Sequence, residues 1–389
     1  MNRIYLDNAA TTAVSQEVLE KMLPYFTQHF GNASSVYDTG RDARKALEEA
    51  RRAVADSLHA KPSEIYFTAG GSESDNWAIK GAAYAHQGKG KHIITTQIEH
   101  HAVLHTCEYL EKQGFEVTYL PVDEYGLVTA AQVEKALRPD TILISIMAAN
   151  NEIGTVMPIA EIGRMARERK VLFHTDAVQA IGAMEVDVEE WHVDMLSLSA
   201  HKFHGPKGVG ALYIRNGVRL DNFVHGGAQE RGRRAGTENV AGIVGLGEAI
   251  RLATLDLPAH VQKVSALRDT LIKGILEHIP EVRLNGHPAK RLPGNVNVSI
   301  RYIEGEAMLL RLDMAGIAAS SGSACTSGSL DPSHVLLAIG LPHEIAHGSL
   351  RFSLSGDTTR EEVDEVIRIL PGIIKTLREM SPLYEMRNQ

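Results

Sequence analysis

The feature that most constrains the fold is a regular alternation of short apolar stretches with amphipathic, helix-like stretches between residues 44 and 214. The stretch 141–147 is almost continuously apolar, which is typical of a parallel strand that is buried on both faces. Strands that alternate with helices predict an α/β fold, in which a mostly parallel sheet is covered by helices on both faces. The predicted strands are residues 64–68, 92–96, 141–147, 171–174, 195–198 and 211–214.

The pattern changes after about residue 257, where a long helix is predicted over 261–278 and a strand over 296–300. A final helix is predicted to begin at Thr359, with Glu362 as the partner in a capping box. We therefore expect a large domain and a smaller α+β domain. The large domain is expected to be residues 15–256, and the smaller one residues 1–14 together with 257–389.

The composition is that of a globular enzyme, and it disfavours several partners and locations. The 389 residues carry 40 Lys and Arg against 48 Asp and Glu, and the net charge of −8 gives no general attraction to nucleic acid or anionic membranes. Two cysteines, Cys107 and Cys325, cannot form a disulfide framework, which favours a reducing compartment. Residues 1–7 lack the apolar core of a signal peptide, and the uncharged stretch 314–330 is too polar to span a membrane. We therefore expect a cytoplasmic protein.

Ligands of open α/β sheets bind at the carboxyl ends of the strands, so the residues that follow each predicted strand are candidate site residues. Gly70, Gly71 and Ser72 follow the strand 64–68 and lead into a helix. The free N–H groups of a helix N-terminus and the Ser72 hydroxyl suit an anion, best a phosphate. On its own, this segment is more typical of a plain glycine turn in which Ser72 caps the helix.

Two charged residues, Asp176 and Lys202, lie at the ends of later predicted strands. Asp176 ends a buried strand, where a carboxylate needs a cationic or N–H partner, although Asp would serve equally well there as a helix N-cap. A lysine held in such a pocket has a lowered pKa, and its neutral amine is a nucleophile suited to a Schiff base. Lys202 could instead extend its charged end to solvent, but the polar residues Ser199 and His201 beside it argue against this interpretation.

The fourth candidate is Cys325, in a stretch of small residues at 318–329 that cannot build a core. We expect a mobile loop of about residues 318–332 there. A cysteine on an exposed loop is available to react, although a harmless linker cysteine would be the default without the other three sites. Among the 18 His, the clusters 99–101 and 201–204 lack the spacing of known metal motifs, so no metal site is predicted.

A phosphate cradle, a buried acid and a Schiff-base lysine on strand ends together describe a pyridoxal 5'-phosphate site. The sequence resembles the NifS/IscS-type cysteine desulfurases, which are fold-type I pyridoxal phosphate enzymes of the class V aminotransferase group. The resemblance extends over essentially the whole chain, and the segment 229–239 looks closer to the NifS branch than to the housekeeping IscS branch. Its motifs, in family order, are His-Thr-Asp-Ala-Val-Gln at 174–179, Ser-Ala-His-Lys at 199–202 and Ser-Gly-Ser-Ala-Cys-Thr at 321–326.

The resemblance implies a fold-type I transferase whose large domain has a mostly parallel seven-stranded sheet. It implies that Lys202 holds the cofactor covalently, that Asp176 pairs with the pyridine nitrogen, and that Gln179 contacts the ring hydroxyl oxygen. Thr237 would reach the phosphate from a neighbouring subunit, so a homodimer is implied as well. The other residues implied to bind the cofactor, mainly its phosphate, are Gly71, Ser72, Ser199 and His201.

The resemblance also implies the substrate contacts and the reaction. His100 matches the residue that stacks on the cofactor ring and acts as acid and base, and Asn151 and Arg351 match the residues that hold the substrate carboxylate. The planar fork of an arginine suits a carboxylate, because it makes two parallel hydrogen bonds. The implied reaction converts L-cysteine to L-alanine and leaves a persulfide on Cys325, whose sulfur passes to an acceptor such as an iron–sulfur scaffold.

The residues leave three alternative functions to consider. Selenocysteine lysis could use the same residues, whereas another class V transaminase would have no use for Cys325. A non-catalytic scaffold protein for iron–sulfur cluster assembly is disfavoured, because Lys202, Asp176 and Cys325 are all present.

Overall fold

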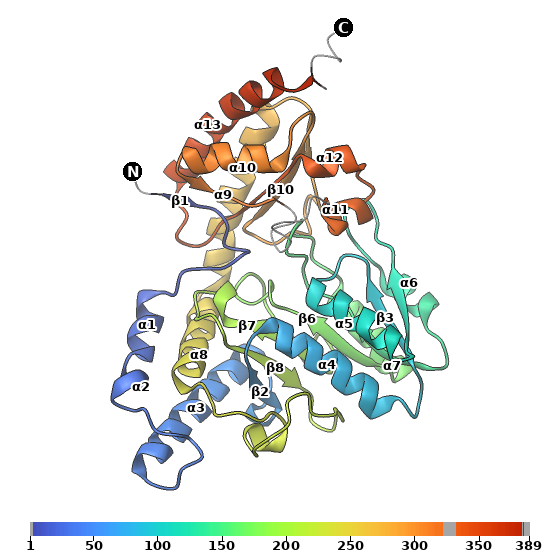
Figure 1. Cartoon of the computed structure of the whole chain (residues 1–389), viewed down its shortest axis with the longest axis vertical. Coiled ribbons are helices and arrows are strands. Elements are labelled where there is room, and N and C mark those ends of the chain that lie inside the picture. The colour runs from blue at the N-terminus through green and yellow to red at the C-terminus, as the bar shows by residue number, and fades with distance from the viewer. Residues whose placement is uncertain (1–2, 322–331, 383, 385–389) are drawn as a thin grey trace.

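Figure 1 shows the computed structural model of the chain, which describes residues 3–321, 332–382 and 384. A large sheet with its helices forms the lower part of the molecule in this view, and a smaller group of helices and strands lies above it. Most of the predicted loop at 318–332, including Cys325, lies outside the described residues.

In the part of the chain that the structure describes, seven strands form the large sheet, in the order β2-β8-β7-β6-β5-β3-β4. β8 is antiparallel to both of its neighbours, and the other neighbouring pairs are parallel. The prediction of an α/β fold with a mostly parallel seven-stranded sheet is therefore confirmed. The strands are β2 Ile65–Thr68, β3 His92–Thr96, β4 Glu116–Leu120, β5 Thr141–Ser145, β6 Leu172–Asp176, β7 Met195–Ser199 and β8 Gly210–Ile214.

The direction of β8 determines at which edge of the sheet the carboxyl ends of the other strands lie. Because β8 is antiparallel to both β2 and β7, these two strands point the same way as β6, β5, β3 and β4. The carboxyl ends of six strands therefore lie along one edge. The sequence analysis did not predict β4, since this edge strand buries only Leu120 and its polar residues Glu116 and Thr118 weaken the apolar signal.

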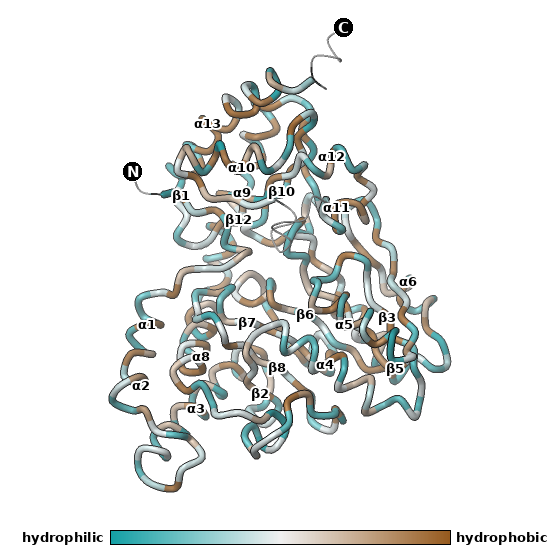
Figure 2. The backbone as a smooth tube through the Cα atoms, in the orientation of Figure 1, coloured by the Kyte–Doolittle hydropathy of each residue, from teal (hydrophilic) through white to brown (hydrophobic). Residues whose placement is uncertain are grey.

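The helices cover both faces of the sheet, because successive strand residues point to opposite sides. Ile65 and Phe67 of β2 pack on one face, and Tyr66 between them packs on the other. Figure 2 shows hydrophobic residues along α8, whose inner side is buried against this sheet. The helices are α4 Gly71–His86 and α5 His101–Lys112 on the Tyr66 face, and α1 Gln16–Met22, α3 Asp38–Ser57, α6 Ala130–Ala136, α7 Ile159–Arg169 and α8 Val240–Leu255 on the other, with α2 Pro24–Thr27 following α1.

A second hydrophobic core lies in the smaller group of elements and takes residues from both ends of the chain. Leu6 is fully buried in this core, directly after β1 (Ile4–Tyr5), which pairs in parallel with β11 (Ile317–Ala318). The predicted capping box at Thr359 and Glu362 is present at the start of the last helix. The other elements are the strands β9 Val282–Leu284, β10 Asn295–Ile300 and β12 Ser349–Ser353, in the sheet order β12-β10-β9, and the helices α9 Leu257–His278, α10 Gly305–Met314 and α13 Arg360–Glu379.

Two short helices late in the chain pack on the large core rather than on the second one. α11 (His334–Ala338) and α12 (His343–His347) contribute Val335, Leu336 and Ala346 to the hydrophobic core of the large sheet. The division of the chain into domains at residue 257 therefore stays a prediction.

A buried ion pair ties α3 to the segment that carries Thr237. Arg51 donates from Nη1 and Nη2 to the two carboxylate oxygens of Glu230, both at 2.8 Å, and both side chains are 3% exposed. Glu230 also accepts a hydrogen bond from the N–H of Phe67 in β2 at 2.9 Å. Glu230 and Arg231 have φ angles of 44° and 59°, a backbone region that non-glycine residues rarely adopt. The ion pair thus holds a strained turn against the sheet.

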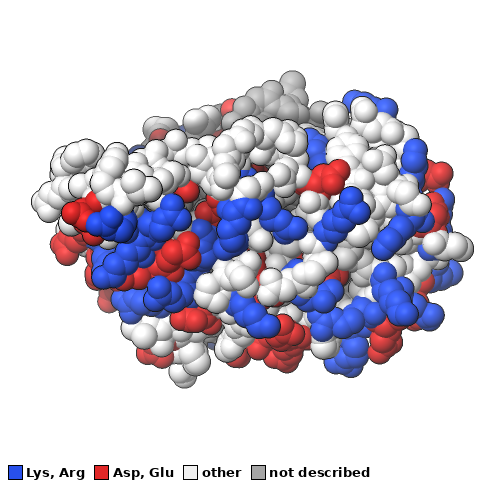
Figure 3. All heavy atoms as spheres, turned by 90° about the horizontal axis from the view of Figure 1, so that it is seen from below, with Lys and Arg blue, Asp and Glu red and all other residues white. Residues whose placement is uncertain are grey.

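The surface carries charges of both signs. Figure 3 shows many Lys and Arg side chains among the Asp and Glu on the face seen from below, although the whole chain has a net charge of −8. Arg215, Arg219 and Arg233 line a shallow cavity of about 330 Å³, together with Tyr66. Within the described residues, no helix is long and apolar enough to cross a membrane, and no group of three or more His, Cys, Asp or Glu is arranged to hold a metal ion.

The substitution Glu230→Gln should destabilise the protein, because the charge of Arg51 would stay buried without an opposite charge. We expect a loss of about 3 kcal/mol in the free energy of unfolding, measured by urea denaturation. The control is Glu365→Gln, since the pair of Glu365 with Arg368 lies exposed on α13 and its loss should cause no measurable change. Equal stabilities of the two variants would contradict a structural role for the buried pair.

Candidate active site

The carboxyl edge of the large sheet brings the predicted cofactor residues together, since most of them follow strands that end there. Ser199 ends β7, and Asp176 ends the neighbouring strand β6. In the pairing register, Thr68 of β2 and Ser199 both lie opposite Gly210 of β8. A Cβ on Gly210 would lie 2.8 Å from the Cα of Gly70, so the absence of a side chain lets the turn after β2 close over β8.

The turn after β2 forms the N-terminus of α4. Gly70 has a φ angle of 145°, and Gly71 is the first helical residue, so Ser72 lies in the first turn and is not the N-cap. A Cβ on Gly71 would lie 2.8 Å from Cγ2 of Val178 and 3.6 Å from the Cβ of Ser199. The first N–H groups of a helix have no acceptor within the helix. They can therefore bind an anion beside the Ser199 side chain.

Lys202 lies in the short 3₁₀ turn η2 (Ala200–Lys202) directly after β7. Its Nζ donates hydrogen bonds to the carbonyl oxygens of Ala9 and Ala10, at 2.6 and 2.7 Å. Gln179 donates from Nε2 to the same oxygen of Ala9 at 3.1 Å. The N-terminal segment thus brings the lysine amine and the Gln179 amide to one place. A cavity of about 590 Å³ has both of these side chains in its lining.

The N-terminal segment also contacts His201. Nδ1 of His201 lies 3.1 Å from the hydroxyl of Thr11, and the N–H of Thr12 donates to the His201 carbonyl oxygen at 2.9 Å. Burial lowers the pKa of His201 to about 4, and the positive charge of Lys202 adds to the shift. His201 is therefore a neutral hydrogen-bonding group at pH 7, in keeping with its predicted contact to a phosphate.

Asp176 is buried, and one of its carboxylate oxygens accepts a hydrogen bond from the N–H of Val178 at 2.9 Å. The bond resembles that of an N-cap, but a turn follows Asp176 instead of a helix. Burial raises the pKa of Asp176 to about 6, while the bond from Val178 and the charge of Lys202 act in the opposite direction. The carboxylate therefore lies within electrostatic reach of the lysine amine, where it can hold a cationic group of a ligand.

A buried polar network lies next to Asp176, and the sequence analysis assigned it no role. The two ring nitrogens of His174 lie 2.9 Å from the hydroxyl of Ser197 and 2.8 Å from that of Ser145. Burial lowers the pKa of His174 to about 3, so the ring is neutral at pH 7. Asp75 of α4 lies 3.6 Å from His174, and burial together with the charge of Asp176 raises the pKa of Asp75. The sequence feature that could have revealed this network is the presence of polar residues, such as His174 and Ser197, inside otherwise apolar strands.

His100 follows β3 at the same edge and is the N-cap of α5. Its Nδ1 accepts a hydrogen bond from the N–H of Ala102 at 3.1 Å. Burial lowers the pKa of His100 to about 4, and the positive charge of Lys202 adds to the shift. The ring is therefore neutral at pH 7, with its proton on Nε2 and with Nδ1 as a hydrogen-bond acceptor.

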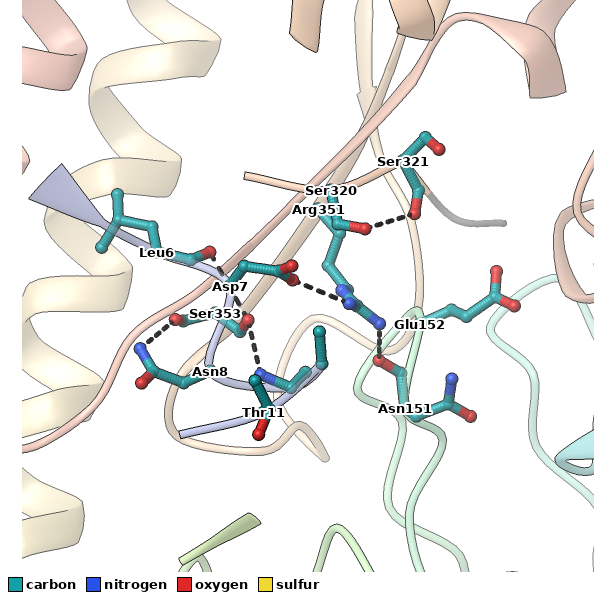
Figure 4. Close-up of polar contacts among 12 residues, drawn as sticks. Leu6, Asp7, Asn8, Thr11, Asn151, Glu152, Ser320, Ser321, Arg351 and Ser353 are labelled. Atoms are coloured by element: carbon teal, nitrogen blue, oxygen red, sulfur yellow. Dashed lines mark hydrogen bonds and ion pairs between the residues drawn. The ribbon is translucent and has the colours of Figure 1, made fainter. Parts of the chain in front are cut away.

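The structure brings the two predicted substrate residues, Asn151 and Arg351, into contact (Figure 4). Arg351 of β12 donates from Nη1 to the backbone carbonyl of Asn151 and from Nη2 to the carboxylate of Asp7, both at 2.9 Å. Glu152 is buried next to Asn151, where burial raises the pKa of its carboxyl to about 7 and the hydroxyl of Ser333 donates to it. The sequence analysis missed Asp7, because 344 residues separate it from Arg351.

Thr237 and Cys325 complete the set of predicted residues, and Cys107 is the other cysteine of the chain. Thr237 is exposed in the single chain, and Arg234 on the same segment forms an ion pair of 2.8 Å with Glu73 of α4. Cys325 lies outside the described residues. Cys107 is fully buried in α5, and burial raises the pKa of its thiol, which keeps the thiol protonated.

The fold and these residues define the chain as an enzyme of the class V aminotransferase family: the family model described as "Aminotransferase class-V" matches residues 4–366. Enzymes of this family use pyridoxal 5'-phosphate. Among curated relatives, the cysteine desulfurase IscS of Methanosarcina thermophila is 61% identical over 380 residues, which cover 98% of this chain and 94% of the relative. The cysteine desulfurase IscS of Dictyoglomus turgidum is 55% identical over 379 residues, which cover 97% of this chain and 96% of the relative.

Solved structures that are similar to this one belong to proteins of the same kind. A NifS-like protein superposes with a TM-score of 0.91 at 41% identity, over 96% of this chain and 100% of that chain. A structure described as SspA in complex with cysteine has a TM-score of 0.82 at 41% identity, over 92% of this chain and 100% of that chain. The resemblance to the NifS/IscS-type cysteine desulfurases is therefore confirmed. The closer affinity to the NifS branch stays a prediction, since both names occur among these proteins.

The residues at the carboxyl edge fit pyridoxal 5'-phosphate in three respects. Lys202 has an amine at the end of a buried strand, where it can hold the cofactor aldehyde. Asp176 has a buried carboxylate that needs a cationic partner such as the pyridine nitrogen. The N-terminus of α4 and the Ser199 side chain can hold the phosphate. We therefore propose that these groups hold the cofactor.

The substitution Gly71→Ala should weaken the binding of pyridoxal phosphate about tenfold, because the added Cβ would clash with Val178 at the proposed phosphate position. The dissociation constant can be measured from the absorbance of the bound cofactor. Gly372→Ala is the control, since a Cβ at this position in α13 meets nothing within 4 Å and cofactor binding should not change. Unchanged affinity in the Gly71→Ala variant would contradict the placement of the phosphate at this turn.

Proposed function

We propose that the protein is a cysteine desulfurase, which converts L-cysteine to L-alanine and transfers the sulfur to its own Cys325. The observation that carries the proposal is the presence of both Lys202 and Cys325 in a chain that is 61% identical to a cysteine desulfurase over 98% of its length. A transaminase on the same fold would need Lys202 but would have no use for Cys325.

The cofactor residues would have separate tasks. Pyridoxal phosphate, when bound, supplies an electron-accepting ring that makes the Cα–H bond of an amino acid acidic. Asp176 would keep the pyridine nitrogen protonated. Gln179 donates a hydrogen bond to the same Ala9 carbonyl as Lys202, and it would orient the cofactor through the hydroxyl oxygen of the ring. Ser72, Ser199 and His201, with the N–H groups of α4, would hold the phosphate.

The substrate residues would bind and deprotonate the amino acid. Arg351 would hold the α-carboxylate of L-cysteine by parallel hydrogen bonds, and the side chain of Asn151 would add a further contact. The amine of Lys202, in its neutral form, would take the proton from Cα and later return it to the same carbon. The contacts of Lys202 with the carbonyls of Ala9 and Ala10 would keep the amine at the edge of the sheet between these steps.

The sulfur would be transferred by Cys325. As a thiolate, Cys325 would attack the substrate sulfur, so that an S–S bond forms while the C–S bond breaks. The thiol proton would pass through His100 to the carbon that loses the sulfur, which becomes the methyl group of alanine. The ring of His100 is neutral at pH 7, because burial lowers its pKa to about 4, and Nδ1 is the nitrogen that could accept the thiol proton. One enzyme thiol and one L-cysteine thus give one persulfide and one L-alanine, without an external oxidant or reductant.

The other cysteine is unsuited to this role. Cys107 is 0% exposed on the inner side of α5, and burial raises the pKa of its thiol. A thiol that is protonated and inaccessible is a poor nucleophile. Cys107 therefore provides a natural control for experiments on Cys325.

The proposal includes a homodimer and a sulfur acceptor. Thr237 is exposed on a segment that is fixed by the Arg51–Glu230 and Arg234–Glu73 ion pairs, and it would complete the phosphate site of a second copy of the chain. The persulfide sulfur of Cys325 would pass to an acceptor protein, such as a scaffold for iron–sulfur cluster assembly. The curated relatives' names, cysteine desulfurase IscS, support this assignment.

The substitution Cys325→Ala should abolish sulfur transfer while L-cysteine still binds, because the carboxylate and amine contacts remain. With a thiol reductant present, we expect the formation of alanine and sulfide from L-cysteine to fall by about two orders of magnitude or more. Cys107→Ala should keep its turnover within about twofold of the unsubstituted protein. Both products can be measured in the same reaction.

Two results would contradict this assignment. Turnover of the Cys325→Ala variant at the level of the Cys107→Ala variant would show that no persulfide on Cys325 is needed. Formation of a keto acid from L-cysteine in place of alanine and sulfide would identify a transaminase instead.

A further inference from the structure

Asp7 is a partner of Arg351 that the proposed mechanism does not use. Its carboxylate accepts a hydrogen bond of 2.9 Å from Nη2 of Arg351, while Nη1 donates to the carbonyl of Asn151 (Figure 4). The side chain of Arg351 is 3% exposed and that of Asp7 is 19% exposed. The ion pair is therefore largely shielded from water, and its geometry is more restrained than that of a surface pair.

The main chain fixes both residues before any ligand binds. Arg351 exchanges two backbone hydrogen bonds with Ser320, at 2.6 and 3.1 Å. Asp7 forms a parallel bridge with Ser353, the next residue but one in β12, and the N–H of Ser353 donates to the carbonyl of Leu6 at 2.7 Å. Because Leu6 is fully buried in the second core, the position of the Asp7 backbone relative to β12 is set by the fold.

The guanidinium of Arg351 has hydrogen-bond donors that Asp7 and Asn151 do not use. A guanidinium carries five N–H groups in one plane. Nε of Arg351 is buried and has no hydrogen-bond partner among the described residues. A buried donor without a partner is costly, and a ligand that brought an acceptor to Nε would relieve this cost. A carboxylate fits best, because it accepts from Nε and an adjacent Nη in parallel.

We propose that Asp7 is a positioning residue, which fixes the plane of the Arg351 guanidinium so that its Nε edge faces the α-carboxylate of the amino acid. The carboxylate of Asp7 accepts a hydrogen bond from Nη2, and the backbone carbonyl of Asn151 accepts one from Nη1. With both terminal nitrogens held, rotation about the last side-chain bonds is restricted. This inference rests on the proposed function in one respect, namely that Arg351 binds the amino-acid carboxylate.

The same short segment also holds the amine side of the site. The carbonyls of Ala9 and Ala10, two and three residues after Asp7, accept hydrogen bonds from Nζ of Lys202. An α-amino acid carries its amine and its carboxylate on one carbon, so a site for it needs two binding groups at a fixed separation. Residues 7–10 would set this separation between Arg351 and Lys202, and Asp7 would thereby contribute to selectivity for α-amino acids.

The test compares the binding of L-alanine and of L-alaninamide, which differ only in that the carboxylate is replaced by an uncharged amide. The absorbance of the bound cofactor in the holoenzyme reports both affinities without turnover. In the Asp7→Ala variant, we expect L-alanine to bind about tenfold more weakly, while the affinity for L-alaninamide stays within about twofold. Asp7→Asn should lose less than threefold for L-alanine, since its amide oxygen can accept the same hydrogen bond (about half the loss in free energy).

The control is Asp313→Ala, which removes the same charge from an exposed ion pair with Arg3 and should change neither affinity. An unchanged preference for L-alanine in the Asp7→Ala variant would overturn the proposal. An equal loss of affinity for both ligands would also overturn it, since it would show a general structural role. A protein that binds L-alanine as expected but releases no sulfide from L-cysteine would refute the proposed function and would still support the role of Asp7.

Discussion

The antiparallel pairing of β8 with β2 on one side and with β7 on the other determines where the reactive groups of this protein lie. It makes β2 and β7 point the same way, so the turn that begins α4 and the turn that carries Lys202 start from one edge of the sheet. The close approach of Gly70 to Gly210 then brings the helix N-terminus next to Ser199. The helix N-terminus, which we propose to bind the phosphate, and the lysine that we propose to hold the cofactor thus start from neighbouring points of one edge.

The first residues of the chain connect this edge to the second core. Leu6 is buried among residues of β10, β12 and α13, while Ala9 and Ala10 accept hydrogen bonds from Lys202. The burial of Leu6 in the second core therefore helps to position the amine of Lys202 at the edge of the large sheet. This arrangement accounts for a site that takes its parts from residues near 7, 100, 176, 202 and 351.

Much of the cofactor edge could be predicted from the sequence, because a charged residue directly after an apolar strand conflicts with burial. Lys202 and Asp176 both gave this signal, whereas β4 gave none, since it is half exposed. The contacts of Asp7 with Arg351 and of Arg51 with Glu230 could not be predicted, because 344 and 179 residues separate the partners and only the folded chain brings them together. The placement of Cys325 stays a prediction.

Lys202, within electrostatic reach of the buried carboxylate of Asp176, is the amine that we propose holds the cofactor. Reduction of the holoenzyme with sodium borohydride, followed by proteolysis and mass spectrometry, identifies the lysine that carries it. We predict a phosphopyridoxyl group on the peptide that contains Lys202. A cofactor attached to another lysine, such as Lys263, which lines the same cavity as Lys202, or to none, would contradict this assignment.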